Sequence, residues 1–138
     1  MMRVVDEFDY KIYRGIRWFF VPISMAANAY FTPLVWMFTV QFFGYLSFGV
    51  FATATIITAA IAPRHRILVV LIHSAIWMFV GAYVFRGSGF ESSLLADIVD
   101  RMKFVAPISA IPLVAAYFMD RYTRNVESKR DAFFAAGS

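Results

Sequence analysis

His73 is the residue with the most chemical potential, because it is an ionisable side chain inside an apolar run, residues 67–85. An ionisable group within a membrane-crossing segment indicates a functional site by default. Its imidazole can be an axial ligand to haem or a chlorophyll-type pigment, a proton relay, or a partner for a neighbouring helix. A bis-histidine haem needs a second buried histidine, and His65 lies at the edge of the run between Arg64 and Arg66. A neutral structural role for His73 is therefore favoured, with cofactor binding and a proton relay as the alternatives.

Other catalytic chemistry has little support in the sequence. The chain has no cysteine and two histidines, which excludes a thiolate metal site and leaves too few ligands for a catalytic zinc site. All nine Asp and Glu residues lie outside the apolar runs, which argues against a transporter driven by a buried carboxylate. No glycine-rich phosphate loop or nucleophile elbow is present. We therefore predict no catalytic residue, no metal site and no required cofactor, and we expect a protein that is not an enzyme.

The apolar runs themselves indicate a membrane protein. Hydrophobic residues make up 61% of the 138-residue chain, and residues 18–63 contain no charged residue or histidine. One helix of that length would reach roughly 69 Å, about twice the ~30 Å core of a bilayer. The stretch therefore predicts two membrane spans joined by a tight turn at residues 41–44. A turn at 28–33 would instead make the first segment re-entrant, and we rank that alternative lower.

Together, the apolar runs predict an all-α integral membrane protein with two helical hairpins. An amphipathic interfacial segment, 1–17, precedes a transmembrane domain, 18–119, and a basic cytoplasmic tail, 120–138. A second amphipathic helix is expected just before the fourth span, where residues 104–119 are short and contain two prolines. The four transmembrane helices are expected at about residues 18–40, 45–62, 67–85 and 104–119.

The distribution of basic residues predicts the orientation. In the four-span arrangement, ten Lys and Arg residues lie on the side of the termini and three on the other side. This bias places both termini in the cytoplasm, by the preference of cytoplasmic loops for positive charge. With a re-entrant first segment, the two sides of the membrane carry seven and six Lys and Arg residues, which gives almost no bias. We expect a bacterial inner membrane, N-in and C-in, and an anionic membrane surface rather than nucleic acid as the partner of the basic residues.

Two groups of residues are expected to position the helices. Asn28 should form an inter-helix hydrogen bond, and the small residues Ala52, Thr55, Ala59 and Ala62 should form a close-packing face. Basic and aromatic residues at the ends of the spans should anchor the protein at the membrane surface. These anchors are Lys11, Arg14, Arg17, Trp18, Arg64, Arg66, Arg121 and Arg124.

Three functions are compatible with this layout. The favoured one is a non-catalytic accessory or structural subunit of a larger integral membrane complex, in contact with lipid and with other subunits or copies of itself. The first alternative is a small oligomeric pore of the phage-holin type, since a short polytopic chain with a basic tail has that general layout. The second alternative is a haem- or pigment-binding membrane subunit that uses His73.

Overall fold

The protein is almost entirely helical in the computed structural model, which describes the backbone of residues 2–86 and 94–137. Within these two ranges there is no β-strand, so the predicted all-α class is confirmed. Some side chains inside the helices, including those of residues 2–10, lie outside the described set. The elements are α1 (Met2–Phe43), the 3₁₀-helix η1 (Gly44–Phe48), α2 (Gly49–Ile61), α3 (Arg66–Arg86) and α4 (Leu94–Ala136).

The helices α1 and α2 form a hairpin whose turn is η1. Gly44 ends α1 with a φ of 52°, a left-handed conformation that glycine adopts at little cost because it has no Cβ. The turn expected at residues 41–44 thus falls at Gly44–Phe48, and α2 begins at Gly49 rather than at residue 45. The helix α1 continues through Asn28 and Pro33, so the alternative turn at that point is not present.

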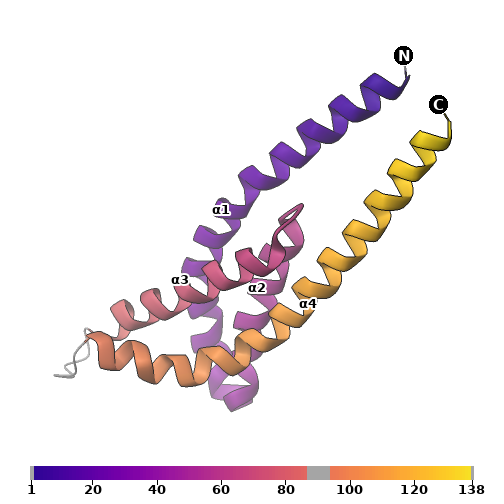
Figure 1. The fold of residues 1–138 in the computed structure, drawn as a ribbon. Coiled ribbons are helices and arrows are strands. Elements are labelled where there is room, and N and C mark those ends of the chain that lie inside the picture. The colour runs from indigo at the N-terminus through magenta and orange to yellow at the C-terminus, as the bar shows by residue number, and fades with distance from the viewer. Residues whose placement is uncertain (1, 87–93, 138) are drawn as a thin grey trace.

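The amphipathic segments expected as separate surface helices are continuous with the long helices. Residues 2–17 are the first part of α1, and the segment before the fourth apolar run is the first part of α4. Pro107 and Pro112 lie inside α4, which bends in the half that contains them (Figure 1). Proline removes one backbone hydrogen bond and crowds the preceding turn, so it bends a helix without necessarily ending it.

The helix α2 lies at the centre and contacts α1, α3 and α4. Small residues on α2 permit this close approach. Ala62 packs with Val21 of α1 and Val69 of α3, while Ala59 packs with residues of α3 and α4. The described core therefore consists mainly of alanine and valine, whereas many phenylalanine side chains lie on the outside.

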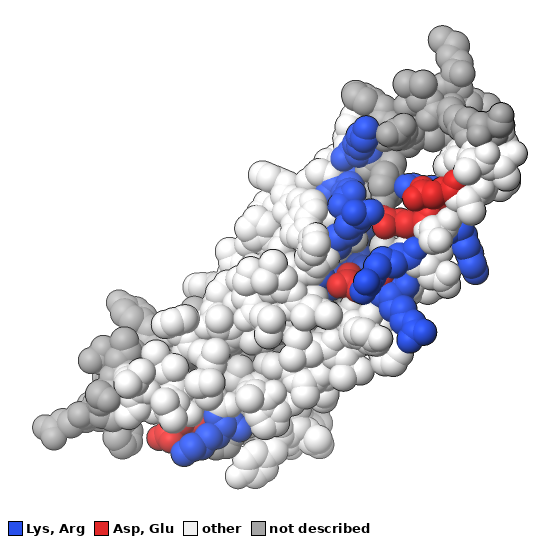
Figure 2. All heavy atoms as spheres, in the orientation of Figure 1, with Lys and Arg blue, Asp and Glu red and all other residues white. Residues whose placement is uncertain are grey.

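The molecule is elongated, with charged groups near its two ends. Both termini and the α2–α3 turn lie toward one end, and η1 lies toward the other (Figure 1). Figure 2 shows Lys, Arg, Asp and Glu near both ends, with an uncharged surface between them. Among the described residues, the stretch Lys11–Ile61, which includes part of α1 and all of η1 and α2, is long and apolar enough to cross a membrane, and Arg66–Phe79 is a shorter apolar helix.

Candidate functional site

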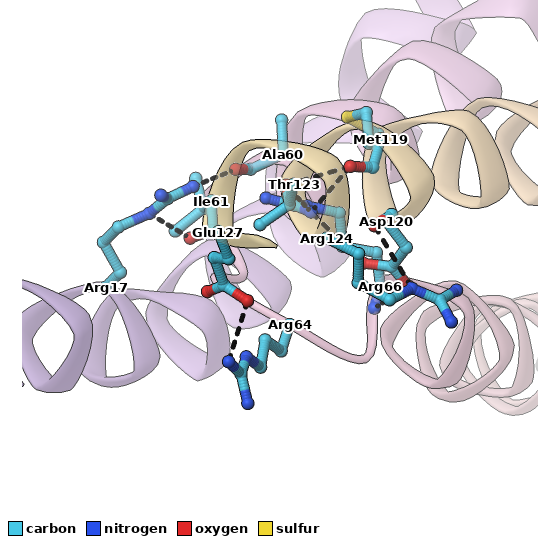
Figure 3. Close-up of polar contacts among 10 residues, drawn as sticks. All are labelled: Arg17, Ala60, Ile61, Arg64, Arg66, Met119, Asp120, Thr123, Arg124 and Glu127. Carbon is cyan, nitrogen blue, oxygen red and sulfur yellow. Dashed lines mark hydrogen bonds and ion pairs between the residues drawn. The ribbon is translucent and has the colours of Figure 1, made fainter. Parts of the chain in front are cut away.

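A cluster of charged and polar side chains joins α1, the α2–α3 turn and α4 (Figure 3). We call this cluster the charged junction. Its members come from positions far apart in the sequence, and they bond both to one another and to the free ends of helices. The residues of the charged junction are Arg17, Arg64, Arg66, Asp120, Thr123 and Glu127.

Arg66 and Asp120 form the buried centre of the charged junction. Arg66 Nη1 donates to Asp120 Oδ1 at 3.1 Å, to Thr123 Oγ1 at 2.8 Å and to the Met119 carbonyl at 3.2 Å. The backbone N–H of Arg66 donates to Asp120 Oδ2 at 3.2 Å. Arg66 is the first residue of α3, so the carboxylate also satisfies a free N–H at the positive end of that helix. One aspartate thus fixes α4 to the beginning of α3.

Arg66, which we expected to act as a membrane-surface anchor, lies buried in the charged junction. The residue is 5% exposed, and its guanidinium is directed at α4 rather than outward (Figure 3). The physical reason is that a carboxylate, a hydroxyl and a carbonyl from one turn of α4 accept hydrogen bonds from Nη1 of the guanidinium. These partners offset part of the loss of hydration that burial imposes, while Nε of Arg66 is buried without a partner among the described residues.

Arg17 performs a similar task at the end of α2. Its Nε donates to the Ile61 carbonyl at 2.9 Å and its Nη2 to the Ala60 carbonyl at 2.6 Å. The last carbonyls of a helix have no partner within that helix, and the end of the helix carries partial negative charge. A guanidinium from α1 therefore caps α2. Its cation also lies 5.5 Å from the centre of the Tyr13 ring.

The remaining expected anchors lie nearer the surface. Arg64 Nη2 contacts Glu127 Oε2 at 2.8 Å, but the Arg64 side chain is 46% exposed, so this ion pair adds little stability. Arg124 donates through Nε to the Asp120 carbonyl at 3.4 Å. The following anchors are exposed or half-buried, as a role at a membrane surface requires: Lys11, Arg14, Trp18, Arg121 and Arg124.

A second polar cluster lies between α1 and α2. Asn28 Nδ2 donates to Thr58 Oγ1 at 2.8 Å and to the Ala54 carbonyl at 3.2 Å. Ser24 Oγ and Thr58 Oγ1 lie 2.9 Å apart and share a hydrogen bond. These contacts cross the interface of the hairpin, which is the kind of bond expected of an amide within an apolar run.

The small-residue face of α2 is directed into the molecule. The exposed fractions are 7% for Ala52, 3% for Thr55 and 0% for both Ala59 and Ala62. Because neighbouring helices of the same chain cover these residues, they are unavailable to a partner protein. A partner would instead meet the outer surface, where side chains such as Phe38 are exposed.

His73 lies fully buried on α3. Neither Nδ1 nor Nε2 has a hydrogen-bond partner among the described residues, and the centre of the Trp77 ring lies 5.3 Å away. The adjacent Ser74 accepts a bond of 2.8 Å from Ser109 of α4. A metal in haem or a chlorophyll-type pigment needs direct access to one imidazole nitrogen. Both nitrogens are enclosed by protein atoms, so this packing does not fit an axial ligand.

The described residues include no group of three or more His, Cys, Asp or Glu side chains that could hold a metal ion. In the charged junction, the Asp120 carboxylate is occupied by two groups of Arg66. The charged junction therefore holds α3 and α4 together.

Sequence reasoning missed the contacts between helices that define the charged junction. It treated Arg66 as an anchor and placed Asp120 within a basic tail. A usable signal was present, because the predicted topology puts the start of the third apolar run and the end of the fourth at the same membrane surface. The first acidic residue after the fourth run, Asp120, then becomes a natural partner for Arg66. No comparable feature of the sequence predicted the Ser74–Ser109 hydrogen bond.

Comparison of the chain with protein-family models, curated proteins and solved structures gives no match.

Proposed function

We propose that the protein crosses a bilayer four times and serves as a non-catalytic subunit that packs sideways against other integral membrane proteins. The observation that carries this proposal is the uncharged surface between two charged ends on the face that Figure 2 shows. Large apolar side chains are exposed along the molecule, among them Phe19, Phe31, Phe38 and Phe79. A surface of this kind is stable in hydrocarbon and unfavourable in water.

The lengths of α1, α3 and α4 support a crossing each, whereas the 13 residues of α2 extend about 20 Å and reach the ~30 Å of a bilayer core only together with η1. The hairpin turn at Gly44–Phe48 divides the long apolar stretch into two antiparallel parts. The 21 residues of α3 extend about 31 Å at the rise of an α-helix, which matches the hydrocarbon thickness. The helix α4 has 43 residues, so its apolar middle can cross while its last part, 120–136, extends beyond the charged junction into water.

The charge bias supports an inner-membrane orientation with both termini in the cytoplasm. The side of the termini carries ten basic residues, including those of the charged junction, against three on the other side. The burial of Arg66 does not change this count, because the preference for positive charge on the cytoplasmic side acts on the loops while the chain is inserted into the membrane. The exposed basic residues of α1 and α4 then lie where anionic headgroups attract them.

The packing supports a structural role in an assembly. The helices bury small residues against one another, and the large side chains point outward, available to neighbouring subunits or lipid. Some polar groups inside the bundle bond to each other, as in the Ser74–Ser109 and Asn28–Thr58 contacts. These bonds hold the helices of the chain together.

The test is to extract the protein from its native membrane in a mild detergent, measure the mass of the extracted particle and identify the proteins that co-purify with it. The expected result is a particle well above 15.7 kDa plus detergent, with other integral membrane proteins present in fixed ratio. A matched sample in harsh detergent should release the chain alone. A single, companion-free chain in the mild detergent would contradict the subunit role, and a large particle of this chain alone would point to a homo-oligomeric pore.

A further inference from the structure

A groove of about 510 Å³ opens between α1 and the η1–α2 segment, in the half of the molecule nearer η1. We call it the α1–α2 groove. Phe43 and Ile57 are apolar members of its lining and are exposed. Four polar side chains line it as well: Asn28, Thr39, Ser47 and Thr53.

The amide of Asn28 has a fixed orientation in this groove. Its Nδ2 contacts the Ala54 carbonyl, which can only accept a hydrogen bond, so the nitrogen and not the oxygen must face that atom. The two N–H groups are used by Ala54 and Thr58. The amide oxygen Oδ1 accepts no hydrogen bond from any residue that the structure describes.

The three hydroxyl groups of the groove are already hydrogen-bonded within their own segments. Each donates to a carbonyl three or four residues earlier: Thr39 to Val35 at 2.9 Å, Ser47 to Gly44 at 2.6 Å, and Thr53 to Gly49 at 2.8 Å. A hydroxyl that donates still retains lone pairs that can accept. The polar side chains of the α1–α2 groove therefore act as acceptors, surrounded by apolar surface.

We propose that the α1–α2 groove binds a lipid-soluble molecule whose hydroxyl group donates a hydrogen bond to Asn28. This inference rests on the proposed membrane location, since the groove would then open to the bilayer. Its volume lies in the ~300–1,000 Å³ range of small-molecule pockets. An acceptor facing hydrocarbon without a donor is unfavourable, which favours an occupant that supplies one.

The test uses a long-chain fatty alcohol that carries a diazirine, and its O-methyl ether, which has the same apolar body but no donor. The protein is reconstituted in lipid nanodiscs, photolabelled with each probe, and mapped by peptide mass spectrometry. The alcohol should label the groove peptides about five- to ten-fold more than the ether, the preference that one net hydrogen bond supplies. Carbonate washing of the native membrane, done in parallel, reports integration into the bilayer independently of labelling.

Variants separate binding in the groove from general contact with lipid. Thr53→Trp should fill the groove and abolish the preference for the alcohol, whereas Leu71→Trp, on the exposed surface of α3, should preserve it. Asn28→Leu should reduce labelling by the alcohol to that by the ether. Equal labelling by both probes in a carbonate-resistant protein, or labelling unchanged in Thr53→Trp, would overturn the proposal while leaving the membrane location intact. Cross-linking of the groove to a second chain in place of the probe would also overturn it.

Discussion

Replacing Asp120 by leucine should produce the largest single loss of stability in the charged junction. The Arg66 side chain is 6% exposed and that of Asp120 is 13% exposed, so the variant leaves a buried guanidinium without its counter-ion. Removal of one partner from a buried pair costs about 3–5 kcal/mol. Arg66 keeps its bonds to Thr123 and the Met119 carbonyl, so we expect about 3 kcal/mol, at the lower end of that range.

The assay is reversible unfolding in mixed micelles with increasing SDS, followed by fluorescence of the three tryptophans. The Arg66→Leu/Asp120→Leu double variant should recover at least half of the loss, because no buried charge remains unpaired. Asp100→Leu is the matched control, since its ion pair with Lys103 is about 70% exposed on both sides and should cost less than about 0.5 kcal/mol. If Asp120→Leu behaves like this control, or if the double variant loses the sum of the two single effects, the charged junction does not fix α4 to α3.

Three further predictions concern single positions and use the same unfolding assay. Gly44→Ala should lower the free energy of unfolding by about 1–2 kcal/mol, since φ is 52° at that residue. Gly15→Ala should raise it by up to about 1 kcal/mol, because Gly15 lies inside α1 with open space at its Cβ. If both substitutions changed stability in the same direction, this account of the turn would be contradicted. Ala59→Leu should lower the free energy of unfolding by about 1–3 kcal/mol, because it overpacks a fully buried site. Ala60→Leu, on the exposed side of the same helix, should leave stability nearly unchanged. A larger loss for Ala60→Leu than for Ala59→Leu would show that the packing face of α2 is assigned to the wrong side. His73→Leu should change stability by no more than about 1 kcal/mol, because the ring makes no hydrogen bond to a described residue; a much larger loss would reveal a partner or ligand.

The local parts of the fold were accessible from sequence because they depend on local patterns. A 46-residue uncharged stretch is too long for one span, and Gly44 is the residue near its middle that tolerates a left-handed turn. The exact turn was misplaced because Phe42 and Phe43 have no feature that ends a helix. The continuity of α1 and α4 was missed for the opposite reason. Changes in polarity suggested separate elements, but the backbone between them contains nothing that forces a break.

Contacts between distant residues were much less accessible. The burial of Arg66 depends on Asp120, which lies 54 positions away along the chain. Charge type alone indicated an anchor, because an arginine beside an apolar run is usually solvated. Arg17 illustrates the same limit: its partners are the carbonyls of Ile61 and Ala60, and backbone acceptors have no signature in the side-chain sequence.

The arrangement of the chain across the bilayer is tested most directly by single-cysteine labelling, since the protein has no cysteine of its own. Tyr45→Cys places a thiol on η1, where the side chain is 87% exposed, and Ser128→Cys places one on the exposed far part of α4. In intact spheroplasts, a membrane-impermeant maleimide should label Tyr45→Cys and leave Ser128→Cys unlabelled until the membrane is opened. Labelling of both positions from outside, or of neither before lysis, would contradict the four-span arrangement with both termini in the cytoplasm.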